Sequence, residues 1–91
     1  MSKITIKYRG QLASLIGVPE EVFEAADPKS QLADVEGVLK TIRERHGREA
    51  EKTARTMLIA LNGESILLLK RYKTKVKEGD SLSFFPLCAG G

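Results

Sequence analysis

The fold is decided by residues 78–91, which read EGDSLSFFPLCAGG. A turn of Glu, Gly and Asp is followed by alternating polar and apolar residues, as in a half-buried strand. Neighbouring strand residues point to opposite faces, so we expect Phe84 to face the core and Phe85 to face away from it. Pro86 has no N–H to donate and ends the strand. The stretch therefore predicts a last strand over residues 81–85, followed by a tail of small residues.

The residues before this strand carry a second strand signal and a tight turn. Residues 57–61 form a continuous apolar run, which is typical of a buried strand. Asn62-Gly63 comes directly after the run and favours a two-residue hairpin turn in which both residues have positive φ. Residues 64–69 are then predicted to return as the partner strand.

The main helix is predicted to begin near Ser30, a candidate N-cap that follows a turn. His46 lies with two arginines in the last turn, where positive charge complements the helix dipole, and the sequence shows no carboxylate partner for it. Gly47 suits a left-handed residue after the helix. Residues 48–56 have no clear period, so we predict a variable connection there. The apolar stripe consists of Leu32, Val35, Val38, Leu39 and Ile42.

The N-terminal half contains two further extended segments. Residues 3–9 alternate and are rich in β-branched residues, which predicts a half-buried strand. Residues 11–16 are predicted to form a short helical turn between two glycines. Pro19 then starts a second extended segment, in which Val22 is the first candidate to face inward and Phe23 the second. Together these segments predict a hairpin with a helical turn in its loop.

The predicted order is strand, strand, helix, strand, strand, strand. One long helix beside such a set of strands predicts an α+β domain, with the helix covering one face of a mixed sheet. A chain of 91 residues has room for one domain. We assign this domain to residues 1–86 and a flexible C-terminal tail to residues 87–91.

Composition and charge exclude several classes of protein. Hydrophobic residues make up 42% and charged residues 30% of the chain, as in an ordinary soluble domain. The longest apolar runs are far below the roughly 20 residues that span a bilayer, and the N-terminus has no signal-peptide pattern. One cysteine and one histidine offer no disulfide and no metal cluster, and a net charge of +3 is mild. We therefore expect a cytoplasmic protein with no bound cofactor or metal, and with no nucleic-acid or membrane partner.

The turn at residues 78–80, the aromatic pair with Pro86 and the terminal Gly90-Gly91 resemble the small subunit of molybdopterin synthase. The resemblance covers nearly the whole chain, including the opening strand, the turn at residues 12–17, the helix and the Asn-Gly hairpin. That subunit belongs to the ubiquitin-like sulfur carriers. The resemblance thus implies a β-grasp fold, with a mixed sheet of about five strands packed on one main helix.

This resemblance implies a two-stage chemistry at Gly91. A partner adenylating enzyme activates the Gly91 carboxylate with ATP, and sulfur then displaces AMP to leave a thiocarboxylate. The tail next enters the large subunit of molybdopterin synthase and donates its sulfur to molybdopterin. Gly90 lacks a Cβ, so the backbone can pass through a narrow channel. The residues predicted to contact partners are Phe85, Pro86, Leu87, Cys88 and Ala89, with cover of Phe85 by its own chain as the alternative.

Other functions would use the same tail. A ubiquitin-like modifier would be joined through Gly91 to lysines of other proteins, and a carrier for thiamine synthesis or tRNA thiolation would share the activation chemistry. A β-grasp interaction module with an inert tail is the third hypothesis. For the basic stretch Lys70–Lys77 we favour a solvated edge, with docking to an acidic partner as the alternative. RNA binding ranks below both because the stretch lacks interleaved aromatic residues.

Overall fold

The alternation of the N-terminal residues starts the sheet. The computed structural model describes residues 2–25 and 33–87. Strands β1 (Ser2–Lys7) and β2 (Glu20–Ala25) run antiparallel, and helix α1 (Gly10–Ile16) lies in their connection, as predicted. The prediction that Val22 faces inward is wrong, since its side chain is 49% exposed. The second candidate, Phe23, is the buried one and lies opposite Ile4.

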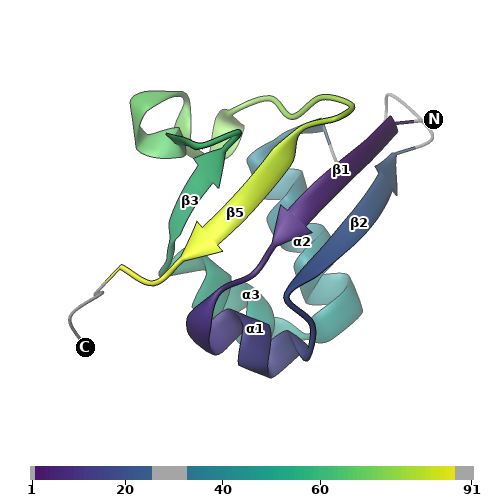
Figure 1. Cartoon of the computed structure of the whole chain (residues 1–91), viewed down its shortest axis with the longest axis vertical. Helices are drawn as coiled ribbons and strands as arrows, with labels where there is room; N and C mark the ends of the chain where they lie inside the picture. Colours follow the sequence, from purple (N-terminus) through teal and green to yellow (C-terminus); the bar gives the residue numbers. More distant parts are fainter. Residues whose placement is uncertain (1, 26–32, 88–91) are drawn as a thin grey trace.

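Strand β5 (Ser81–Phe85) lies in the middle of a five-stranded sheet with the order β2-β1-β5-β3-β4 (Figure 1). It runs parallel to β1 and antiparallel to β3 (Leu58–Leu61). The predicted hairpin turn is confirmed, because Asn62 and Gly63 have φ values of 52° and 88°.

The prediction of a strand over residues 64–69 is correct for the first two residues and wrong for the rest. Strand β4 spans only Glu64–Ser65, and the chain then forms a 3₁₀ turn, η2 (Ile66–Leu68), followed by η3 (Arg71–Lys73). The Ser65 hydroxyl accepts a hydrogen bond from the backbone N–H of Leu67, which begins this turn. An apolar run alone did not distinguish a strand from this turn.

Helix α2 (Val35–His46) covers one face of the sheet (Figure 1). It begins later than predicted, with Asp34 rather than Ser30 as its N-cap, and the Asp34 carboxylate accepts a hydrogen bond from the Gly37 N–H at 2.8 Å. Ser30 and Leu32 of the prediction lie outside the described residues. The other members of the apolar stripe, Val35, Val38, Leu39 and Ile42, are fully buried as predicted.

The segment predicted as a variable connection is instead helix α3 (Arg48–Arg55). Its buried face consists of two alanines four residues apart, Ala50 and Ala54, which is a weak hydrophobic signal. Gly47 has the predicted positive φ of 98°, but its ψ of 173° lies outside the left-handed helical region. The reason is that Gly47 also serves as the N-cap of α3, where the backbone must be extended.

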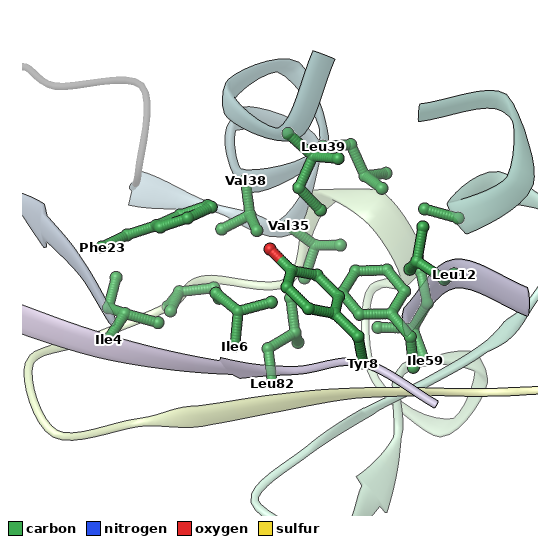
Figure 2. Packing of buried hydrophobic residues seen from close by; sticks show 14 of the residues in the cluster. Ile4, Ile6, Tyr8, Leu12, Phe23, Val35, Val38, Leu39, Ile59 and Leu82 are labelled. Atoms are coloured by element: carbon green, nitrogen blue, oxygen red, sulfur yellow. The ribbon is translucent and has the colours of Figure 1, made fainter. Parts of the chain in front are cut away.

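One hydrophobic core lies between the sheet and the helices. Ile4 and Ile6 of β1 and the following Tyr8 meet Leu82 of β5 beneath Val35, Val38 and Leu39 of α2 (Figure 2). Phe84 of β5 belongs to the same cluster. The mixed five-stranded sheet with its three α-helices is an α+β domain of the β-grasp, ubiquitin-like fold, as predicted. Within residues 2–25 and 33–87, no helix is long and apolar enough to cross a membrane.

Candidate functional site

The candidate site is the surface where the tail leaves the sheet. Strand β5 ends at Phe85, which pairs with Leu58 of β3, and the exposed residues Pro86 and Leu87 follow. The other predicted site residues lie outside the described residues: Cys88, Ala89, Gly90 and Gly91.

The two aromatic residues of β5 divide between core and surface as predicted. Phe84 has no exposed area, and its ring centroid lies 6.2 Å from that of Tyr8. Phe85 faces the other side and keeps 37% of its area exposed, so its own chain covers it only in part. An aromatic side chain in this position is available to a partner at the base of the tail.

A glycine of the first loop packs against the base of the tail. Gly10 has a φ of +57°, and a Cβ at this position would lie 2.9 Å from Cγ of Pro86. Side-chain-bearing residues rarely adopt this φ, and the contact is too close for a methyl group. From the sequence, Gly10 was only one of the two glycines that bound the predicted helical turn at residues 11–16, because a contact across 76 positions leaves no local signal.

Replacing Gly10 with alanine is expected to lower the free energy of unfolding by about 1–2 kcal/mol, because it combines a left-handed φ with a clash. Pro86→Ala removes the clashing atom. In the double variant the total loss should therefore be smaller than the sum of the two single losses. Chemical denaturation of the four proteins measures this difference, and strictly additive losses would show that the contact has no energetic role.

Two hollows flank the base of the tail. The larger, of about 500 Å³, has a mostly apolar lining that includes Leu58, Leu67 and Leu87. The smaller, of about 270 Å³, lies between Pro86, Leu87 and the start of β3. We call Leu58, Leu67, Phe85 and Leu87 the tail-base surface. Leu67 and Leu87 are 59% and 68% exposed, which makes the tail-base surface the candidate site for contact with another protein.

A polar cluster joins the end of α2 to the first two strands. The Tyr8 hydroxyl donates a hydrogen bond to Oε1 of Glu21 at 2.7 Å, and Nε2 of His46 lies 2.7 Å from the same oxygen. His46 thus has a carboxylate partner, contrary to the prediction, because the pair is separated by 25 residues in the sequence. Burial raises the pKa of Tyr8, and its hydrogen bond to Glu21 acts in the same direction.

Two carboxylates of the fold have a lowered pKa. Burial by itself would raise the pKa of Glu21, but hydrogen bonds from Tyr8 and His46, with the charges of His46 and Arg45, lower it. Hydrogen bonds from Arg55 lower the pKa of Glu36. A carboxyl group whose pKa is lower in the folded state than in the unfolded state stabilises the fold. This stabilisation is fully present at a pH above the pKa in the unfolded state, and it is lost as the pH falls through the pKa in the folded state.

We expect the free energy of unfolding to fall as the pH drops below about 4.5, the ordinary pKa of these carboxyl groups. Glu21→Gln should be less stable than the wild type at neutral pH, and this difference should shrink below pH 4.5. Glu24→Gln, at an exposed position of the same strand, is the matched control and should follow the wild-type profile. Urea unfolding across this pH range tests the prediction, and a constant difference between Glu21→Gln and wild type would contradict it.

The described residues hold no group of three or more His, Cys, Asp or Glu side chains that could bind a metal ion. The features that stand out are instead the fold and the apolar surface at the end of its last strand. A mixed sheet packed on one main helix, with a last strand that leads to the C-terminal residues, defines the class of β-grasp, ubiquitin-like proteins. The chain belongs to the ThiS family, whose family model matches residues 6–91.

Solved structures with the same fold extend this comparison. Small archaeal modifier protein 1 from Methanosarcina acetivorans superposes with a TM-score of 0.80 and 19% identity, covering 100% of this chain and 98% of that one. A putative molybdopterin converting factor, subunit 1, from Pyrococcus furiosus has a TM-score of 0.70 and 24% identity, covering 94% of this chain and 98% of that one. A chain from the protein–protein complex of subunits 1 and 2 of molybdopterin-converting factor from Helicobacter pylori has a TM-score of 0.63 and 21% identity, covering 98% of this chain and 99% of that one. A comparison with curated protein sequences finds no match.

Proposed function

We propose that this chain is a sulfur carrier that is activated at Gly91 and serves as the small subunit of a molybdopterin synthase. The observation that carries the proposal is the ThiS family match, which extends through residue 91 and therefore includes the Gly-Gly tail. The similarity to a putative molybdopterin converting factor, subunit 1, supports the proposal of this pathway. We place the protein in the cytoplasm, with residues 1–86 as the domain and 87–91 as the reactive tail.

The proposed reaction converts a poor electrophile into a carrier of sulfur. The Gly91 carboxylate attacks the α-phosphorus of ATP on a partner adenylating enzyme, which releases pyrophosphate and forms an acyl adenylate. Hydrosulfide, or an equivalent donor of sulfide-level sulfur, then attacks the carbonyl carbon; the C–O bond to the phosphate breaks, AMP leaves and a thiocarboxylate remains. Gly90 and Gly91 have no Cβ, which lets the tail pass through a narrow active-site channel. The chain itself needs no bound cofactor for these steps.

The proposed partners are the adenylating enzyme and the large subunit of the synthase. The Helicobacter pylori protein was solved as a complex of subunit 1 with subunit 2, which supports the second partner. We propose that Phe85, Pro86 and Leu87 contact these partners at the base of the tail, and that Cys88 and Ala89 follow the tail into the active site. Exposed aromatic and aliphatic side chains around a fixed point of entry are the usual anchors of such a contact.

Replacing Leu87 with serine is expected to lower the rate of adenylation about tenfold or more when the adenylating enzyme is limiting. The reason is that the substitution removes an apolar anchor beside the tail. The free energy of unfolding should change by less than about 0.5 kcal/mol, since Leu87 is exposed. Leu15→Ser is the matched control, because Leu15 is an exposed leucine that lines neither hollow at the base of the tail. Equal rates for Leu87→Ser and Leu15→Ser would argue against the proposed contact.

A second candidate function is modification of other proteins through Gly91. The similarity to small archaeal modifier protein 1 favours it, because that structure superposes over the full length of this chain. In a lysate of the host, conjugates of higher mass that disappear when Gly91 is deleted would establish this function. Thiocarboxylate without conjugates would support the carrier function alone.

A further inference from the structure

A third hollow lies at the opposite end of β5 from the tail. It has a volume of about 690 Å³, and its lining includes Lys70, Lys75 and Lys77 together with Leu68 and Leu69. The loop that carries these lysines leads into β5 at Ser81, whereas the tail leaves β5 at Phe85 (Figure 1). None of Phe85, Pro86 and Leu87 lines this hollow, so a ligand confined to it would not cover them.

The lysines are held in place by the buried residues between them. Thr74 and Val76 are 6% and 7% exposed, and their backbone groups pair with the start of α2. The Val35 N–H donates to the Thr74 carbonyl, and the Val76 N–H donates to the Ala33 carbonyl, both at 3.0 Å. Because residues of an extended segment alternate, this anchoring directs Lys75 and Lys77 to the same outer side.

The charge of the hollow is positive. Three lysines of its lining, Lys70, Lys75 and Lys77, outnumber its two carboxylates, those of Glu64 and Asp80, so that three positive and two negative charges leave a net formal charge of +1. Asp80, which also lines the hollow, is engaged by the turn itself: its carboxylate accepts hydrogen bonds from the Asn62 side chain at 2.9 Å and from the Lys77 N–H at 2.7 Å. Within residues 2–25 and 33–87, none of Lys70, Lys75 and Lys77 forms an ion pair.

These features distinguish the hollow from a merely solvated edge. The edge strand β4 ends at Ser65, so the lysines do not protect an open ladder. They instead surround exposed apolar area, since Leu68 and Leu69 are 76% and 37% exposed. A ligand that satisfies both parts of the lining needs carboxylates for the lysines and an aliphatic group for the leucines.

We infer that this hollow is a docking site for an acidic segment of a partner protein in which large aliphatic residues lie among the aspartates and glutamates. The positive charge attracts such a segment and orients it, while the leucines provide contact for its apolar residues. RNA fits the lining less well, because no aromatic residue of the hollow could stack on a base. A partner held here keeps the carrier close while the tail enters an active site elsewhere.

Binding of a short peptide of aspartate, glutamate and leucine to the full chain tests this inference by fluorescence anisotropy. Lys75→Glu/Lys77→Glu should weaken binding about tenfold or more. Arg48→Glu/Lys52→Glu, on exposed positions of α3, lowers the net charge equally, from +3 to −1, and should change the affinity less than about twofold. Amide chemical shifts should move at residues 61–70 and 74–80.

The apolar part of the site has its own test. Leu68→Ser should weaken binding of the leucine-containing peptide but not of a peptide in which serine replaces every leucine. No binding to the wild-type chain, equal loss in the two charge variants, or shift changes centred elsewhere would each overturn the inference. An RNA oligonucleotide that displaces the peptide and depends on the same two lysines would overturn it in favour of nucleic acid. Sulfur loading at Gly91 is measured separately and does not depend on this outcome.

Discussion

Gly91→Ala is expected to lower sulfur loading about a hundredfold, because a misplacement of the reacting group by about 1 Å has an effect of this size. The added methyl group would lie next to the carboxylate that must reach the α-phosphorus of ATP. Formation of AMP by the adenylating partner, followed together with the mass of the C-terminal peptide, measures the loss.

The fold provides the control for this variant. The core residues that the structure describes lie between Ile4 and Phe84, so we expect the free energy of unfolding of this variant to equal that of the wild type. The Gly91→Ala chain should also compete with the wild type for the adenylating enzyme, because the tail-base surface is intact. Normal thiocarboxylate formation in this variant would contradict a role for Gly91 as the reactive residue.

Phe84→Ala is expected to lower the free energy of unfolding by about 3–5 kcal/mol, the usual loss when a buried phenylalanine is truncated. Phe84 has no exposed area and packs against Tyr8 in the centre of the core. A loss of this size is a large part of the total stability of a small domain, which is about 5–15 kcal/mol.

Phe85→Ala is the matched control, since the residue is the same but faces the opposite side of the strand. Phe85→Ala should lower the free energy of unfolding far less than Phe84→Ala does, because Phe85 is 37% exposed. Phe84→Leu preserves most of the core volume and should keep the domain folded, with a loss below about 1.5 kcal/mol. Equal losses for Phe84→Ala and Phe85→Ala would contradict the assignment of the two faces.

The parts of the fold with a strong periodic pattern could be predicted from the sequence. The apolar stripe of α2, the Asn62-Gly63 turn and the alternation of β5 each depend on neighbours close in the chain. Helix α3 was missed because its apolar face is only two alanines, although acidic residues in its first turn and basic ones in its last turn agree with the helix dipole. The 3₁₀ turns after Ser65 were missed because an apolar run fits either structure.

In the candidate site, too, features that depend on neighbouring residues could be predicted from the sequence, and features that join distant residues could not. The exposure of Phe85 followed from strand alternation, since it needs only the position of the core residue beside it. The contact of Gly10 with Pro86 and the pairing of His46 with Glu21 could not be predicted, because each joins residues far apart in the chain. The anchoring of the lysine segment by Thr74 and Val76 is likewise a tertiary feature. The roles of Cys88, Ala89, Gly90 and Gly91 remain predictions.

The most direct test of the central claim is the intact mass of the purified chain after incubation with host lysate, ATP and a sulfur source. We predict a mass change that matches replacement of one oxygen by sulfur, confined to the C-terminal peptide that ends at Gly91. An unchanged C-terminal carboxylate in a lysate that loads a known sulfur carrier would contradict the proposed function.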